Sequence, residues 1–143
     1  MKRNEIKKHL QDYLLGLDRG FSFVAASKRI LFDGNQFYID LVFYNYILKC
    51  FVLIDIKTGD LSPNDQEQMK LYVDFYSREM MSEGDNPPVG LVLCADKSDA
   101  TVKYIMTEDN KQVLASRYMT YIPSEEEIKR ELKIDEFQKY KDG

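Results

Sequence analysis

The chain has 143 residues, of which 44% are hydrophobic and 13% aromatic, and its formal net charge is −4. This length and composition fit one globular domain over residues 1–143 and exclude an intrinsically disordered chain. The acidic balance argues against nucleic-acid binding through bulk positive charge, although a local basic patch or a bound metal ion can serve an acidic protein. No apolar run approaches the roughly 20 residues of a membrane span, so we expect no membrane association.

The first part of the chain predicts a helix followed by a hairpin. Apolar side chains recur at helical spacing from Ile6 to Leu17, which predicts an amphipathic helix over residues 4–17 with Asn4 as its N-cap. Residues 21–32 are typical of one strand, or of two short strands with a break near the middle. The Asp33-Gly34-Asn35 sequence then predicts a hairpin turn.

The central part predicts two strong strands, a helix and a buried strand. The strands are expected over residues 36–46 and 49–57. Ser62 followed by proline predicts the start of a helix over residues 63–82, because serine is a good N-cap and proline suits the first helical position. The uninterrupted apolar run over residues 89–94 predicts a short strand in a sheet that is covered on both faces.

The last third of the chain predicts a helix, a strand and a helix. We expect a short helix over residues 99–107, a last strand over residues 112–121 and a charged helix over residues 124–139. The last of these begins with Ser124-Glu125-Glu126-Glu127, which matches a capping box. The predicted order is α-β-β-β-α-β and then α-β-α, with a core over about residues 4–122.

The few cysteine and histidine residues limit the kinds of site that the chain can form. Cys50 and Cys94 each adjoin apolar strand residues, so we expect buried thiols of a cytoplasmic protein rather than a disulfide framework. His9 is the single histidine, which excludes a metal site built from several histidines and argues against a Ser-His-Asp triad.

Asp40 and Asp55 each interrupt an apolar strand, where aspartate is depleted and a buried carboxylate is costly unless it is paired or binds a metal. A two-residue turn at residues 47–48 would set the two acids directly across from each other, with Cβ atoms roughly 4.5–5.5 Å apart. Like charges so placed need a counter-ion, and a hard divalent ion such as Mg²⁺ fits that need. Lys57 lies two residues beyond Asp55 and projects from the same strand face.

The simpler interpretation is that Asp55 and Lys57 form an ion pair on an exposed face, with no further role. The expected pairing of Asp40 with Asp55 favours the metal site over this alternative.

Several segments, taken in order, resemble the PD-(D/E)xK nuclease superfamily and, within it, the C-terminal nuclease domain of the YhcG family. The tripeptide D-x-K is common by chance, whereas the whole set in this order and spacing is much more specific. The resemblance covers about residues 5–122 and implies an α/β fold with a restriction-endonuclease-like αβββαβ core, a mixed β-sheet flanked by helices. The matching segments are GFSFV at 20–24, FYIDLVFY at 37–44, IDIKTG at 54–59, QMKLY at 68–72 and NPPVGLVLC at 86–94.

The resemblance implies a role for each residue of the central trio. Asp40 and Asp55 would bind Mg²⁺ or Mn²⁺, and the carbonyl of Ile56 would complete the coordination of the ion. Lys57 would be the catalytic lysine.

Three further residues match weaker features of the superfamily. Gln68 and Tyr72 lie four residues apart on one helix face and look like the Q-xxx-Y feature of RecB-like members, which implies that Gln68 belongs to the catalytic site and helps to order it. Glu5 matches the glutamate that many members carry on the first helix near the metal. The simpler alternatives are a surface residue for Gln68, a core residue for Tyr72 and a partner of the helix dipole for Glu5.

The implied function is a Mg²⁺-dependent nuclease that hydrolyses phosphodiester bonds of DNA, or of RNA, by metal-activated water. The alternative is a catalytically inactive nuclease-fold domain that binds nucleic acid or protein. A small-molecule or acyl-transfer enzyme lacks support, because the chain has no nucleophile motif and no Gly-rich phosphate loop. The basic side chains that would line one face toward DNA are Lys28, Arg29, Lys49, Lys70, Arg78, Lys97 and Lys103.

Two departures from the YhcG pattern matter. The acid before the catalytic lysine is Asp55, where the family usually has glutamate; the superfamily uses either, but the shorter side chain shifts the metal. YhcG-type proteins also carry a separate N-terminal domain, so we expect either one domain of a longer protein or a stand-alone form that depends on another domain or partner for targeting. A homodimer is a further expectation, because many such nucleases pair to cut both strands.

Overall fold

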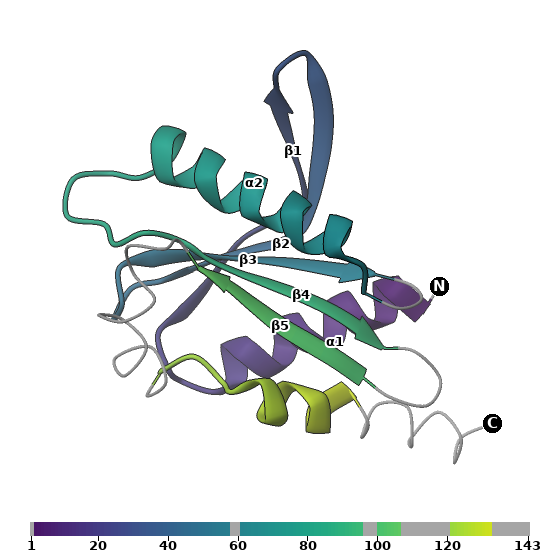
Figure 1. Ribbon diagram of the computed structural model, residues 1–143. Coiled ribbons are helices and arrows are strands. Elements are labelled where there is room, and N and C mark those ends of the chain that lie inside the picture. The colour runs from purple at the N-terminus through teal and green to yellow at the C-terminus, as the bar shows by residue number, and fades with distance from the viewer. Residues whose placement is uncertain (1, 58–60, 96–99, 107–120, 133–143) are drawn as a thin grey trace.

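The computed structural model describes residues 2–57, 61–95, 100–106 and 121–132 (Figure 1). In addition to the labelled elements given below, the structure has a helix over residues 125–132. The predicted α-β-β-β-α-β order is confirmed by the first six elements. In chain order the elements are α1 (Lys2–Gly16), β1 (Phe21–Phe32), β2 (Asn35–Asn45), β3 (Cys50–Lys57), α2 (Pro63–Glu79), β4 (Val89–Ala95) and β5 (Ala100–Met106).

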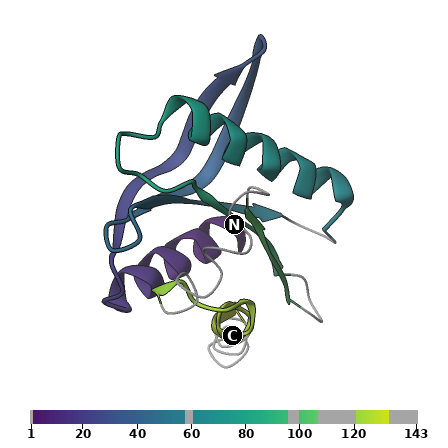
Figure 2. The same cartoon turned by 60° about the vertical axis from the view of Figure 1, so that its left-hand side comes forward.

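The strands form one mixed sheet in the order β1-β2-β3-β4-β5. β3 and β4 run parallel, and the other neighbouring strands run antiparallel. The parallel pair requires a crossover, which α2 supplies. Figures 1 and 2 show α2 on one face of the sheet, with α1 and the 125–132 helix on the other. The predicted α/β fold with a mixed sheet between helices is therefore confirmed.

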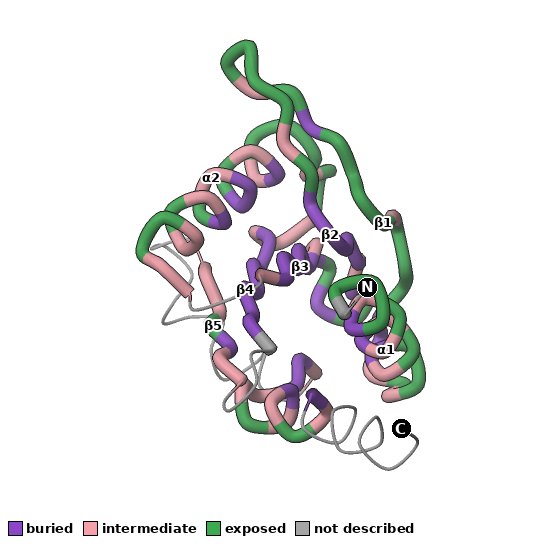
Figure 3. The backbone as a smooth tube through the Cα atoms, turned by 90° about the vertical axis from the view of Figure 1, so that its right-hand side faces the viewer, coloured by how far each residue is buried: buried purple, intermediate pink, exposed green. Residues whose placement is uncertain are grey.

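Two hydrophobic cores lie on the two faces of this sheet. The α1-side core joins α1 to strand residues such as Leu41 and Ile54. The α2-side core joins α2 to Ile39, Leu53 and Val92. Buried positions follow the middle of β2, β3 and β4 in Figure 3, as expected for a central sheet that is covered on both sides.

Part of the C-terminal third differs from the prediction. The helix predicted over residues 99–107 is wrong, because β5 pairs antiparallel with β4 along its length, from Ala95↔Ala100 to Val89↔Met106. Pairing at the sheet edge satisfies the backbone groups that a helix would have satisfied internally. The strand predicted over residues 112–121 lies outside the described residues except for its last position.

Two of the predicted helix starts, at Asn4 and at Ser124, have different outcomes. α1 begins at Lys2, so Asn4 lies inside the first turn and does not cap the helix. The capping role of Ser124 is confirmed, because its Oγ accepts the backbone N–H of Glu127 at 3.1 Å. Of the helix predicted over residues 124–139, the part beyond residue 132 lies outside the described residues.

β1 and β2 form a long hairpin whose far part reaches past the end of β3. β1 is a single strand with a bulge between Phe23 and Ala25. Asp33 and Gly34 have φ values of 50° and 77°, which confirms the predicted turn. We call residues 28–39 the hairpin arm; Figures 1 and 3 show its tip projecting from the sheet.

The turn between β2 and β3 is held by a buried amide. Asn45 Oδ1 accepts the N–H groups of Ile47 and Leu48 at 3.1 and 3.0 Å, and its Nδ2 donates to the Arg19 carbonyl at 3.1 Å. The turn spans residues 46–49, longer than predicted, yet it closes on the predicted pair Asn45↔Cys50. The Asn45 amide thus fixes the register of β2 against β3, a role that a glycine-containing turn has in other hairpins.

Two findings complete the fold. Cys50 and Cys94 are both buried, as expected. Within the described ranges, no helix combines the length and apolar character needed to cross a membrane.

Candidate functional site

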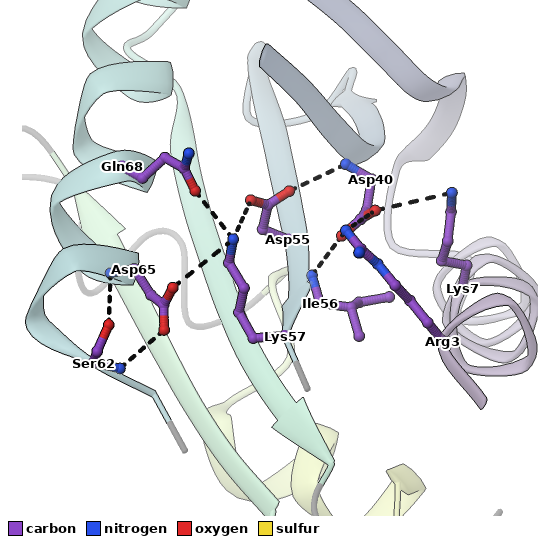
Figure 4. A network of polar contacts seen from close by, with 9 residues as sticks. All are labelled: Arg3, Lys7, Asp40, Asp55, Ile56, Lys57, Ser62, Asp65 and Gln68. Atoms are coloured by element: carbon purple, nitrogen blue, oxygen red, sulfur yellow. Dashed lines mark hydrogen bonds and ion pairs between the residues drawn. The ribbon is translucent and has the colours of Figure 1, made fainter. Parts of the chain in front are cut away.

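Asp40 and Asp55 meet where β2 parts from β3. The ladder between these strands ends at Leu41↔Ile54, the pair next to the two acids, so the predicted register is confirmed up to that point. Beyond it, side chains replace backbone pairing. The N–H of Asp40 donates to Asp55 Oδ1 at 3.1 Å, and the N–H of Ile56 donates to Asp40 Oδ2 at 2.7 Å (Figure 4). Asp40 is 5% exposed and Asp55 is 3% exposed.

The side-chain alternation of β2 changes at this junction. Ile39 belongs to the α2-side core, whereas Leu41 belongs to the α1-side core, although alternate residues of a regular strand share one face. The change falls at Asp40, whose carboxylate meets side chains of α1. Side chains of α1 therefore contact Asp40, whereas the side chains that approach Asp55 lie on the α2 side of the sheet.

Lys57 is held against Asp55 by α2. Its Nζ lies 3.5 Å from Asp55 Oδ2 and donates to Gln68 Oε1 at 3.0 Å. Asp65 Oδ1 lies 3.9 Å from the same Nζ. The structure therefore brings together four of the residues singled out from the sequence: Asp40, Asp55, Lys57 and Gln68.

Asp65 is a contact of Lys57 that sequence reasoning missed. It occupies the N3 position of α2, where its Oδ2 accepts the N–H of Ser62 at 2.9 Å and its own N–H donates to Ser62 Oγ at 3.2 Å. This capping box was readable as Ser-x-x-Asp. It also fixes the first turn of α2, and Gln68 reaches Lys57 from the next turn of the same helix.

Two basic residues of α1 at the site were also missed. Arg3 Nη2 lies 2.7 Å from Asp40 Oδ1 and 2.8 Å from Oδ2 (Figure 4). Lys7 Nζ lies 4.0 Å from Asp40 Oδ1 and donates to Ser27 Oγ at 2.9 Å. Their i, i+4 spacing puts both side chains on one helix face, but nothing local says which strand α1 crosses.

The surroundings of Asp55 raise its pKa. Burial, followed by the charge of Asp40, raises the pKa of Asp55 from 3.8 to about 6; the N–H of Asp40 and the charge of Lys57 act in the opposite direction. Burial and the charges of both acids also raise the pKa of Tyr72, which lies in the α2-side core as its simpler interpretation predicted. Burial and the neighbouring acid therefore disfavour the ionised form of Asp55.

The two remaining predicted metal ligands are Glu5 and Ile56. Glu5 is exposed in the first turn of α1. Ile56 contacts the site through its N–H, and coordination by its carbonyl remains a prediction. The described residues contain no cluster of three or more Asp, Glu, His or Cys side chains arranged to hold a metal ion, so Asp40 and Asp55 are the acids brought together here.

Those predicted basic residues that the structure describes are exposed but spread over the molecule. Lys28 and Arg29 lie on the hairpin arm, and Lys49 lies in the turn at the opposite end of β2. Lys70 and Arg78 lie on α2, Lys103 lies on β5, and Lys97 is outside the described residues. Arg78 is drawn toward the arm, because its guanidinium lies 5.7 Å from the ring centroid of Phe32.

Comparison with known proteins identifies the family of the chain. The family model described as the YhcG PDDEXK nuclease domain matches residues 2–133. The curated Escherichia coli (strain K12) protein named "Putative nuclease YhcG" is 36% identical over 124 residues, which are 87% of this chain and 33% of that protein. The chain thus spans about a third of the length of that relative.

A solved structure titled "Crystal structure of SSO0001" is similar with a TM-score of 0.42 and 15% identity, over 85% of this chain and 59% of that chain. The family match covers nearly the whole described structure and includes the acids, the lysine and the glutamine gathered at the β2–β3 junction. The chain belongs to the YhcG family, as a PDDEXK nuclease domain.

Proposed function

We propose that this domain hydrolyses phosphodiester bonds of DNA as a Mg²⁺- or Mn²⁺-dependent nuclease. One observation carries the proposal: Asp40 and Asp55 are buried side by side, and Lys57 Nζ lies 3.5 Å from Asp55 Oδ2. Two neighbouring buried carboxylates are a costly arrangement for a structural purpose, and perturbed acids of this kind cluster at functional sites.

The donor set fits a hard divalent cation. Asp40 and Asp55 present carboxylate oxygens, which Mg²⁺ prefers, and burial followed by the charge of Asp40 raises the pKa of Asp55, whose ionised form a cation would stabilise. These two residues would hold the ion, with the carbonyl of Ile56 as a third ligand and Glu5 as the remaining candidate acid. When bound, the ion would lower the pKa of a coordinated water and neutralise charge on the scissile phosphate.

The side chains around Lys57 suit a positioning task. Its ammonium would donate to a phosphate oxygen or to the attacking water, in a setting where a small misplacement is costly. Gln68 and Asp65 approach Nζ from α2 and limit the rotation of this long side chain. Gln68 therefore acts through Lys57 and orders the site.

The hairpin arm supports nucleic acid as the substrate. Tyr38 lies two residues before Asp40, is 55% exposed, and pairs across the arm with exposed Arg29. An exposed aromatic ring beside a cation is the combination that single strands use for stacking and phosphate contact. We propose that a DNA strand lies along this face of the arm and thereby reaches Asp40.

The proposed activity is tested with plasmid, single-stranded DNA and RNA, each incubated with Mg²⁺, Mn²⁺ or EDTA. Cleavage should need the metal and should be lost in Asp55→Asn and in Lys57→Met. Asp12→Asn and Lys8→Met are the matched controls, since they change the same residue types in an exposed pair on α1. Wild-type protein that binds Mn²⁺ but cuts none of the three substrates would contradict nuclease activity of this domain.

A catalytically inactive binding module is the second candidate. It is favoured by the contacts of Arg3 with both oxygens of Asp40, which neutralise that acid without a metal. It predicts DNA binding that EDTA leaves unchanged, and no Mn²⁺ binding that depends on Asp40 or Asp55.

The curated relative is about three times as long as the segment matched here, which suggests functions outside this domain. Because the match covers 33% of that protein, we propose that target selection resides in another domain or a partner. We also propose a cytoplasmic location, in keeping with the buried thiols Cys50 and Cys94, and a homodimer that cuts both strands. Light scattering of the purified domain, with and without DNA, tests the dimer.

A further inference from the structure

We infer that Arg3 is a displaceable counter-ion of the metal site: a divalent cation binds Asp40 only after the Arg3 guanidinium has moved away from it. This role rests on the proposed metal-dependent function, and it concerns a residue outside the Asp40, Asp55 and Lys57 trio.

Both carboxylate oxygens of Asp40 are already occupied. Arg3 Nη2 lies within 2.8 Å of each of them, and Oδ2 also accepts the backbone N–H of Ile56 at 2.7 Å. The N–H of Ile56 is part of β3 and cannot leave without opening the junction of β2 and β3. The guanidinium is the contact that can leave, and it is the one that covers both oxygens.

The charges at the site balance without a metal. Three acids, Asp40, Asp55 and Asp65, are in contact with three bases, Arg3, Lys7 and Lys57. A divalent cation would therefore leave the cluster two charges too positive, at separations where repulsion between cations is strong. Arginine cannot relieve this by losing a proton, so the relief has to come from movement.

Arg3 is the base best placed to move. Its side chain is 48% exposed, whereas those of Lys7 and Lys57 are 15% and 22% exposed. Lys7 is also held by Ser27 Oγ, and Lys57 by Gln68 Oε1. Within the described residues Arg3 makes its polar contacts with Asp40 and has no comparable second anchor, so it can turn into solvent from the start of α1.

Two consequences follow for the protein without metal. Arg3 keeps the Asp40 carboxylate neutralised and ordered, and it weakens the binding of metal, because part of the binding free energy is spent on breaking its contacts. Removing Arg3 should therefore strengthen metal binding even though the two carboxylates are untouched.

The test is calorimetric titration of Mn²⁺ into the metal-free protein. We expect Arg3→Met to bind Mn²⁺ about tenfold more tightly than wild type, by loss of the competing cation. Arg3→Lys should lie between the two, because it keeps the charge but shortens the reach and lacks the guanidinium. Lys8→Met is the matched control: it removes one positive charge from the same helix at an exposed pair with Asp12, and its affinity should stay within about twofold of wild type.

The outcomes separate this role from the proposed function. If wild type binds Mn²⁺, Asp40→Asn abolishes the binding and Arg3→Met binds no more tightly, then the counter-ion role is wrong and the metal site stands. If neither wild type nor Arg3→Met binds Mn²⁺, both are wrong. Circular dichroism establishes folding, and if Arg3→Met does not fold, Arg3→Lys decides, since equal or weaker binding in that variant also overturns the role.

Discussion

The backbone N–H of Asp40 donates to Oδ1 of Asp55 at 3.1 Å, at the point where the ladder between β2 and β3 stops. Asp55 thus accepts the N–H that a further ladder pair would have used. The N–H of Ile56 makes the matching contact to Asp40 Oδ2. Two like charges are held next to each other by backbone groups of two core strands, so their separation does not depend on flexible side chains.

The first prediction concerns pH and the buried charge of Asp55. Its pKa is about 6 in the folded protein and near 3.8 when unfolded, so the folded state binds the proton more tightly. Stability from this group is fully present below about pH 4 and is lost as the pH rises through about 6. In EDTA, Asp55→Asn should therefore be more stable than wild type at neutral pH, by about 1–3 kcal/mol.

Urea denaturation of both proteins between about pH 4 and pH 8 measures this difference. Asp74→Asn is the control, because Asp74 is exposed on α2. A wild-type protein that gains stability relative to Asp55→Asn as the pH rises would contradict the prediction.

The second prediction concerns Gln68, whose Oε1 accepts from Lys57 at 3.0 Å. Gln68→Ala should lower kcat about 10–100-fold with a smaller change in KM, since the lysine loses a contact that orients it. Gln66→Ala is the matched control: it changes the same residue type in the same turn, on another side of α2. An equal loss in both variants would point to a general effect on α2.

The third prediction concerns the hairpin arm. Tyr38→Ala should weaken the binding of single-stranded DNA by about fivefold or more, through loss of a stacking platform. Tyr46→Ala is a matched control, because Tyr46 is 59% exposed and lies at the other end of β2. Fluorescence anisotropy in EDTA separates binding from cleavage; similar affinities for both variants would exclude a role for the arm.

The fourth prediction concerns the packing of α2 on β4. A Cβ added at Gly90 would lie 2.6 Å from Met69 Cγ and 2.9 Å from Val73 Cγ2. Gly90→Ala should cost about 1–3 kcal/mol of unfolding free energy, and Gly90→Val more, although movement of the flexible methionine reduces the cost. Because Met69 adjoins Gln68, cleavage should fall as well. At Gly16 nothing lies within 4 Å of such a Cβ, so Gly16→Ala should leave both properties unchanged.

The fifth prediction concerns the register that brings the acids together. Asn45→Ala removes three hydrogen bonds of a fully buried amide and should lower the unfolding free energy by about 1–3 kcal/mol. Asn64→Ala, at an exposed position early in α2, should have little effect. Chemical denaturation compares the two, and equal costs would show that the turn does not depend on Asn45.

Local sequence patterns were sufficient for much of the fold and for the centre of the site. The apolar strands with their interrupting acids, the Asp33-Gly34 turn and the Ser62 cap are features of neighbouring residues, and the structure has each of them. The placement of Lys57 beside Asp55 also follows from the strand period alone. The sequence by itself therefore determined the central trio and, through the order of its motifs, the family.

Tertiary structure decided what depends on residues far apart in the chain. Residues 100–106 carry a local pattern open to helix or strand, and the free edge of β4 makes them β5. Arg3 meets Asp40 across 37 positions of sequence because α1 packs over the β2–β3 junction, and no local signal encodes that crossing. Asp65 reaches Lys57 because the first turn of α2 lies beside the end of β3. The local sequence of β2 and β3 places the two acids and Lys57, whereas the positions of Arg3 and Lys7 depend on how α1 packs on the sheet.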